Sequence, residues 1–267
     1  MKKSELECPK DSRGNFELNE YVIGVDVARS DASSNNKSAI VVLKIIRSAS
    51  TSKIRQLQLV NIVEPPNGLT FKEQSIIIKR LFYKYGGSLD MNKSRVKAIV
   101  IDGNGLGKGL VDYMTDDVTD PDNNKELGAF DIINGKDNFH SKTPKIIYNL
   151  NASGINKHII TNFIDQVDAQ ILQLLTVDDE MKKHAVNANF DMIDDSKARI
   201  LTQGLVDEIS NLKLKHTSNN MTVEQVLKKI DKDKYSALAY GLYYIKLFLD
   251  FEIVEEEVDE NKQYVIF

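Results

Sequence analysis

The chain has 267 residues, of which 42% are hydrophobic and 28% are charged, and its formal net charge is −4. These values indicate a soluble globular protein with one sizeable core. No apolar stretch approaches the roughly 20 residues that span a bilayer, and the amino-terminal residues lack the apolar core of a signal peptide, so a cytoplasmic protein is expected. The single cysteine, Cys8, excludes an internal disulfide framework and a cysteine-cluster zinc site.

The slightly acidic charge does not point to nucleic acid as a partner, because phosphate contacts are normally made by clustered Lys and Arg side chains. It does not exclude nucleic acid either. An active site built of carboxylates is negative until metal ions bind, and local basic patches can coexist with an acidic whole. We therefore expect weak affinity for DNA by this chain alone.

The first part of the chain predicts three strands joined by polar turns. Residues 1–19 are polar and are expected to form a loose lead-in. Short runs of β-branched and apolar residues predict buried strands at 21–27 and 38–46, and spaced apolar residues predict a third strand at 54–63. Strands connected by short polar turns in this way favour an antiparallel meander.

Helices and strands alternate in the next part of the chain. Thr70 is a plausible N-cap with Glu73 three residues later, a capping box that predicts the start of a helix. A buried strand is predicted at 97–102, followed by the glycine-rich turn 103–107 and a second helix, and a further strand fits 129–133. This β-β-β-α-β-α-β order is that of an α/β, RNase H-like fold, with a mixed sheet flanked by helices.

The remainder of the chain is mainly helical. Helices are predicted at 157–175 and 197–210, and a small hairpin arm is predicted at about 211–223. Residues 233–250 are apolar nearly all round, which predicts a buried helix. The tail, 251–267, is acidic in its first part.

Three aspartates occupy positions that a hydrophobic core would not favour. Asp26 and Asp102 each end a predicted buried strand, and Asp233 opens the apolar helix. A buried carboxylate is unfavourable unless it is paired or coordinates a metal. Carboxylate oxygens are hard ligands suited to Mg²⁺ or Mn²⁺, and three or four of them can hold two ions about 3.5–4 Å apart. The three aspartates are therefore the candidate metal ligands and catalytic residues of a two-metal hydrolase.

Each aspartate also has a structural interpretation. An Asp at a strand end is often a turn former, and Asp233 could serve as a helix N-cap. Asp231 lies two residues before Asp233 and is an alternative third ligand. Asp31, in the polar turn after the first strand, fits a solvated turn residue better than a ligand.

The segments around these aspartates resemble a known family, the nuclease domain of the tailed-phage terminase large subunit. The matching segments are Gly24–Ala28, Ala98–Gly107 and Lys232–Tyr240. The resemblance covers roughly residues 20–250. It implies that Asp26, Asp102 and Asp233 bind two metal ions, Mg²⁺ or Mn²⁺.

The resemblance also implies a biological setting. It implies an endonuclease that cuts double-stranded, concatemeric viral DNA during genome packaging in the cytoplasm of an infected bacterium. The implied partners are the terminase ATPase domain, the small terminase subunit and the portal. The chain departs from the family in one respect: it contains no phosphate-binding loop, because Gly109 follows Gly107-Lys108 where a Ser or Thr is required. ATP-driven translocation is therefore not expected of it.

Several other side chains carry weaker signals. Three residues of the predicted hairpin could contact DNA phosphates, although such a charge run is more often a solvated face: Lys213, Lys215 and His216. The histidines at 140, 158 and 184 have no metal-ligand spacing. Four tyrosines of the last helix follow helical spacing and fit a core better than a base-stacking surface: Tyr235, Tyr240, Tyr243 and Tyr244.

Three alternatives stay open at this point. Actin-like ATPases and sugar kinases share a related sheet, but their duplicated domain and Gly-rich adenosine motif are not visible in this sequence. A Holliday-junction resolvase would use the same acids on branched DNA. A non-catalytic interaction module would use the acids merely to cap helices and strands.

Overall fold

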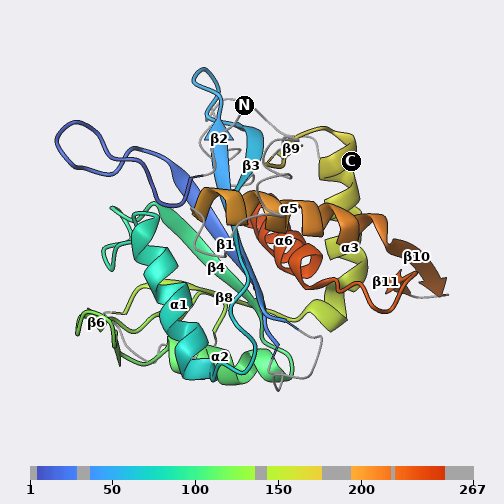
Figure 1. Ribbon diagram of the computed structural model, residues 1–267. Helices are drawn as coiled ribbons and strands as arrows, with labels where there is room; N and C mark the ends of the chain where they lie inside the picture. Colours follow the sequence, from blue (N-terminus) through green and yellow to red (C-terminus); the bar gives the residue numbers. More distant parts are fainter. Residues whose placement is uncertain (1–4, 29–36, 136–142, 176–193, 218–219, 250–267) are drawn as a thin grey trace.

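The computed structural model describes residues 5–28, 37–135, 143–175, 194–217 and 220–249, and Figure 1 shows the path of the chain. A seven-stranded sheet forms the centre of the described part, in the order β7-β8-β4-β1-β2-β3-β9. Its strands are β1 (Glu20–Asp26), β2 (Ala39–Arg47), β3 (Ile54–Val63), β4 (Val96–Asp102), β7 (Asp131–Ile132), β8 (Lys145–Leu150) and β9 (Leu172–Gln173).

The directions of the strands confirm the predicted fold class. β1, β2 and β3 pair antiparallel, as the predicted meander requires. β4 pairs parallel with β1 on one side and with β8 on the other. This mixed sheet, with an antiparallel half joined to a parallel half at β1, is the RNase H-like arrangement.

Helices cover both faces of the sheet (Figure 1). One face packs against α1 (Phe71–Lys84) and α2 (Leu106–Met114). The other face packs against α3 (Ala152–Asp168), α5 (Asp194–Ser210) and α6 (Asp233–Tyr244), which continues into a π-helical turn, η1 (Ile245–Leu249). Two small hairpins complete the described part: β5 (Val118–Thr119) with β6 (Glu126–Leu127), and β10 (Leu212–Thr217) with β11 (Asn220–Gln225). None of the described helices is both long and apolar enough to cross a membrane.

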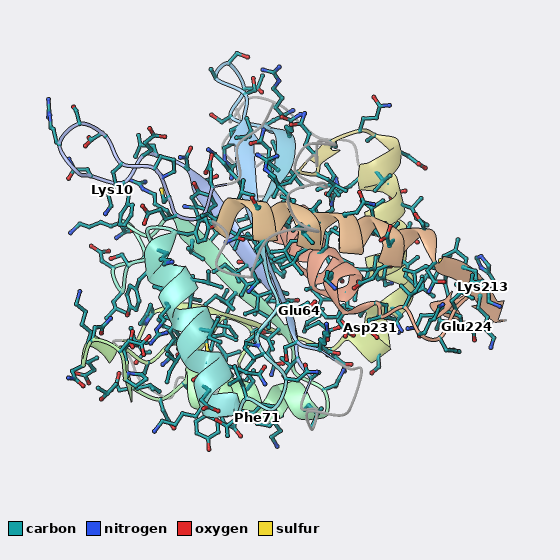
Figure 2. The ribbon with its side chains drawn as sticks, viewed as in Figure 1. Lys10, Glu64, Phe71, Lys213, Glu224 and Asp231 are labelled. Atoms are coloured by element: carbon teal, nitrogen blue, oxygen red, sulfur yellow. The ribbon has the colours of Figure 1, made fainter. Side chains whose placement is uncertain are left out.

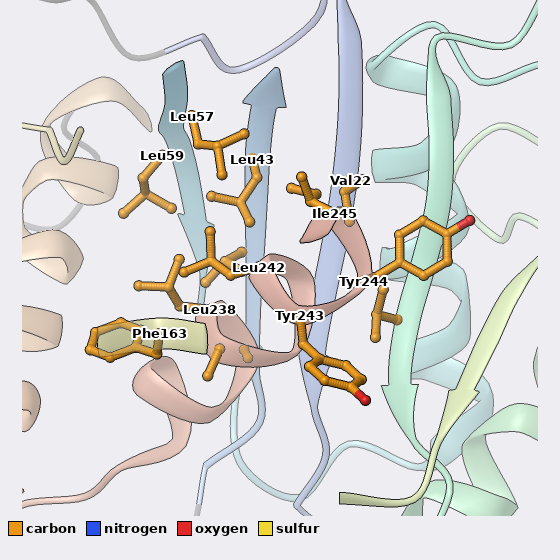
Figure 3. Close-up of a cluster of buried hydrophobic side chains, with 14 of the residues drawn as sticks. Val22, Leu43, Leu57, Leu59, Phe163, Leu238, Leu242, Tyr243, Tyr244 and Ile245 are labelled. Atoms are coloured by element: carbon orange, nitrogen blue, oxygen red, sulfur yellow. The ribbon is translucent and has the colours of Figure 1, made fainter. Parts of the chain in front are cut away.

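Successive residues of the central strands face α6 and α1 in turn. The residues that face α6 are apolar and form one core beneath it. Val22 of β1, Leu43 of β2 and Leu57 of β3 meet Leu238 and Leu242 of α6 in one buried cluster (Figure 3). Helices on both sides bury both faces of β1, β2 and β4, so these strands are nearly continuous apolar runs.

The predicted helix signals are largely confirmed. Thr70 is the N-cap of α1 and forms the predicted capping box with Glu73. α3 differs from the predicted range, 157–175. It begins at Ala152, where the Asn151 side chain accepts a hydrogen bond from the Gly154 amide at 3.2 Å, and it ends at Asp168 because the chain turns into β9.

One predicted strand is much shorter than expected, and another strand of the sheet was not predicted. The range 129–133 contains only the two-residue edge strand β7, and the strand that pairs with β4 is β8, for which no prediction was made. β8 is a short Lys-Ile-Ile-Tyr-Asn-Leu run in which polar residues interrupt the apolar ones. Ile146 and Ile147 are nevertheless fully buried, because the parallel pairing with β4 places this strand inside the sheet.

The amino-terminal lead-in is not loose over its described part, contrary to its polar composition. Cys8 is 1% exposed and its amide donates to the Lys84 carbonyl at 3.0 Å. The Glu5 carboxylate accepts hydrogen bonds from the Tyr21 hydroxyl at 2.7 Å and from Lys44 Nζ. The segment therefore supplies partners for polar groups at the sheet that would otherwise be buried alone. The acidic tail predicted at 251–267 lies outside the described residues.

Gly24 in the middle of β1 allows α6 to pack very close to the sheet. A Cβ atom built on Gly24 would lie 2.1 Å from the Ala237 carbonyl oxygen of α6, a distance at which backbone would have to move. Sequence analysis treated Gly24 only as part of a motif, but its role is steric. The close contact fixes the start of α6 beside the end of β1.

We predict that Gly24→Ala lowers the free energy of unfolding by about 1–3 kcal/mol, the usual effect of overpacking a tight core. Gly204→Ala is the matched control, because a Cβ on this residue of α5 would meet its nearest atom at an ordinary 3.7 Å. That control should be neutral or slightly stabilising because alanine favours helix. Urea unfolding of both variants measures the difference, and equal stabilities would contradict the steric role.

Candidate active site

The carboxyl-terminal ends of β1 and β4 lie side by side. These strands are parallel neighbours, with Val25 in register with Ile101, so the next residues, Asp26 and Asp102, end adjacent strands at the same edge of the sheet. Both side chains are partly buried. The arrangement predicted for this pair from strand order is therefore present.

The start of α6 brings Asp233 to the same edge. Asp233 is the first residue of α6, and the helix crosses β1, β2 and β4. Its carboxylate accepts a hydrogen bond from the Lys37 amide, 3.1 Å from Oδ2. The N-cap of the helix is Lys232, not Asp233, so the capping interpretation of Asp233 is wrong.

The charges of Asp102 and Asp233 both act on Asp26. Burial raises the pKa of Asp26 to about 8, with further increases from the negative charges of Asp233 and Asp102. Burial also raises the pKa of Asp233 to about 6, and the charges of Asp231 and Glu208 add to that increase. Partly buried like charges repel one another, and a bound cation would relieve this repulsion.

Asp102 is held in place through one of its two oxygens. Oδ1 accepts hydrogen bonds from the Asn104 amide at 3.3 Å, from Asn104 Nδ2 at 3.1 Å and from the Ala152 amide at 3.2 Å. No hydrogen bond from the described residues engages Oδ2, and this oxygen is the one that Asp102 can offer to a ligand. Gly103 belongs to the same turn, where a Cβ would collide with the Asn149 side chain.

Two residues of α6 next to the acids were missed by sequence analysis. Ser236 lies beside the Asp26 carboxylate, where its side chain lowers the pKa of Asp26, and it has the same effect on the pKa of Tyr240. Burial raises the pKa of Tyr240, and the charges of Asp26 and Asp102 raise it further, so this tyrosine borders the site as well as the core. Their positions in the sequence were the available signal. Ser236 and Tyr240 follow Asp233 by three and seven residues, a spacing that places all three side chains on one face of the helix.

The donor set fits hard divalent cations. Among the residues that the structure describes, no group of three or more His, Cys, Asp or Glu side chains is placed to hold a metal ion. Mg²⁺ usually takes one or two protein carboxylates and completes its shell with water and substrate phosphates. Asp26 with Asp102, and Asp26 with Asp233, are the pairs of carboxylates whose charges act on each other here.

The remaining candidate ligands divide by position. Asp231 is partly buried, and its charge reaches Asp233 (Figure 2). Whether it binds metal stays a prediction. Asp31, His140 and His184 lie outside the described residues, and His158 is exposed on α3.

The predicted hairpin is formed by β10 and β11, and its basic residues are exposed. Lys215 Nζ lies 2.6 Å from a Glu224 oxygen and Lys213 Nζ lies 4.0 Å from the other. Figure 2 shows Lys213 and Glu224 together at the end of the arm, away from the sheet. Surface ion pairs of this kind are weak, so both lysines can exchange Glu224 for another anion. His216 is also exposed.

Comparisons with known proteins give structural likenesses without a sequence match. No family model matches the chain, and no curated protein matches it. The structure is similar to the large terminase nuclease domain of Thermus phage P74-26, with a TM-score of 0.46, 16% identity and coverage of 90% of both chains. It is also similar to the human cytomegalovirus terminase nuclease domain, Mn soaked and inhibitor bound, with a TM-score of 0.39, 8% identity and coverage of 86% of this chain and 85% of the other. These identities are too low to carry an activity over to this chain.

Proposed function

We propose that this chain is a metal-dependent endonuclease that hydrolyses phosphodiester bonds of double-stranded DNA. The observation that carries the proposal is the convergence of Asp26, Asp102 and Asp233 at one edge of an RNase H-like sheet, where two of these carboxyl groups have raised pKa values. Carboxylates that lie together and repel one another serve no evident purpose in the fold. They are explained if cations bind between them.

The three aspartates would hold two ions, Mg²⁺ or Mn²⁺. Bound ions of this kind activate a water nucleophile and stabilise the leaving 3′ oxygen. The protein's own groups set the geometry. The Asn104 side chain and the Ala152 amide orient Asp102, the Lys37 amide orients Asp233, and the Ser236 side chain lies beside Asp26.

The setting that we propose is the packaging of a viral genome, where concatemeric DNA is cut. Support comes from the three motifs around the aspartates, which resemble those of terminase large subunits. The proposed partners are an ATPase domain, a small terminase subunit and a portal, in the cytoplasm of an infected bacterium. DNA contact by Lys213, Lys215 and His216 belongs to the same proposal.

We predict that Asp26→Asn, Asp102→Asn and Asp233→Asn each lower Mn²⁺-dependent nicking of plasmid DNA by about 100-fold or more, since loss even of groups that only orient metal ligands lowers activity about 10- to 100-fold. Asp207→Asn is the matched control because Asp207 is an exposed acid of α5. Normal cleavage by all three site variants would contradict the assignment.

The same assay separates the alternative functions. Four-way junctions tested beside linear duplexes should not be preferred, because preference for the junction would indicate a resolvase. Tight binding of ATP without any DNA cleavage would indicate the kinase-like alternative. Absence of cleavage at high protein concentration, with folded protein, would favour an interaction module.

The raised pKa values predict how pH changes the stability of the metal-free protein. Folded Asp26 and Asp233 have pKa values of about 8 and about 6, above the unfolded value of about 3.9. Between these limits the folded state retains protons that the unfolded state releases, so the free energy of unfolding falls as pH rises from about 4 to 8.

Thermal unfolding in EDTA across this pH range measures the effect. The midpoint of the wild-type protein should fall as pH rises, and Asp26→Asn should reduce that slope and stabilise the protein at pH near 8. Parallel slopes for the two proteins would show that Asp26 is not held in an unfavourable environment.

A further inference from the structure

The start of α6 lacks a cap of its own. The first amides of a helix have no partners within the helix and are usually satisfied by a Ser, Thr, Asp or Asn side chain at the N-cap. The N-cap of α6 is Lys232, and its side chain makes no capping hydrogen bond. An acceptor for these amides must come from elsewhere.

Glu208 of α5 supplies that acceptor from a different helix. Its Oε2 accepts a hydrogen bond from the Tyr235 amide at 3.0 Å, and its Oε1 lies 2.9 Å from Lys234 Nζ. The Tyr235 amide is the third of the helix, the position that an N-cap oxygen normally serves. Glu208 is only 3% exposed, so its carboxylate is committed to these two donors.

This arrangement leaves the Asp233 carboxylate available to the site. Asp233 is the first residue of α6, so its carboxylate is an acceptor that could turn to the uncapped amides if Glu208 were absent. Instead its carboxylate faces the Lys37 amide and the charge of Asp26. We propose that Glu208 is a positioning residue, which caps α6 in place of Asp233 and so keeps Asp233 directed at the metal site.

A network of ion pairs balances the charge of Glu208. The same network includes Lys37, whose amide holds Asp233. Lys234 Nζ lies 2.9 Å from Glu208 and 3.1 Å from Glu64. Glu64 in turn accepts from Lys37 Nζ at 2.7 Å, and the amide of Lys37 is the one that holds Asp233. The Glu208 cap of α6 and the Lys37 amide that holds Asp233 are therefore tied to one group of ion pairs.

Two substitutions separate capping from general stability. Glu208→Gln retains an oxygen that can accept from the Tyr235 amide, whereas Glu208→Leu removes it. Asp120→Asn is the control, because Asp120 is also a buried carboxylate, 2% exposed and paired with Arg80, but it belongs to the region of β5 and β6. Mn²⁺ affinity measured by calorimetry on the full chain is the readout, and it requires no cleavage.

The inference rests on the proposed function, and it predicts a distinct order of affinities. Glu208→Leu should weaken Mn²⁺ binding about 10-fold or more, as loss of groups that orient metal ligands does. Glu208→Gln should weaken it much less, and Asp120→Asn should bind like the wild type. Wild-type affinity in Glu208→Leu, or an equal loss in Asp120→Asn, would overturn the proposal.

A crystal structure of Glu208→Leu separates this proposal from the proposed function. If the wild-type protein binds no Mn²⁺, the proposed function fails, but the role of Glu208 is still decided. A turn of the Asp233 carboxylate from the Lys37 amide towards the uncapped amides of α6 supports it. An unchanged Asp233 overturns it.

Discussion

The close approach of α6 to β1 is the contact on which the site depends. It exists because Gly24 has no side chain where the Ala237 carbonyl of the helix arrives. Asp26 lies two residues after Gly24, and Asp233 lies four residues before Ala237. One glycine in a buried strand thereby determines that an acid from the end of the strand and an acid from the start of the helix meet at the same edge.

The site combines a rigid support with an unfavourable charge arrangement. β1 and β4 are buried on both faces, so the strand ends that carry Asp26 and Asp102 have little freedom to separate. Hydrogen bonds to Asp102 and Asp233 restrict the carboxylates further. The fold therefore holds negative groups together although they repel one another. This arrangement lowers the stability of the metal-free protein and provides a place where cations can bind.

The sequence allowed prediction of the parts of the site that depend on local pattern. Asp26 and Asp102 stand out because each ends an apolar run, and Asp233 because it begins one. Ser236 and Tyr240 carry only their helical spacing from Asp233 as a signal, and Glu208 could not be identified at all, since its role comes from packing between two separate helices. β8 escaped prediction for a related reason: its burial is a result of pairing with β4, while its own residues show only a short apolar run.

The central claim is that the three aspartates form one cation site, and anomalous scattering from crystals soaked in Mn²⁺ tests it most directly. We expect anomalous peaks within bonding distance of Asp26 and of at least one of Asp102 and Asp233. Peaks elsewhere with none at this edge, or no peaks at saturating Mn²⁺, would contradict it.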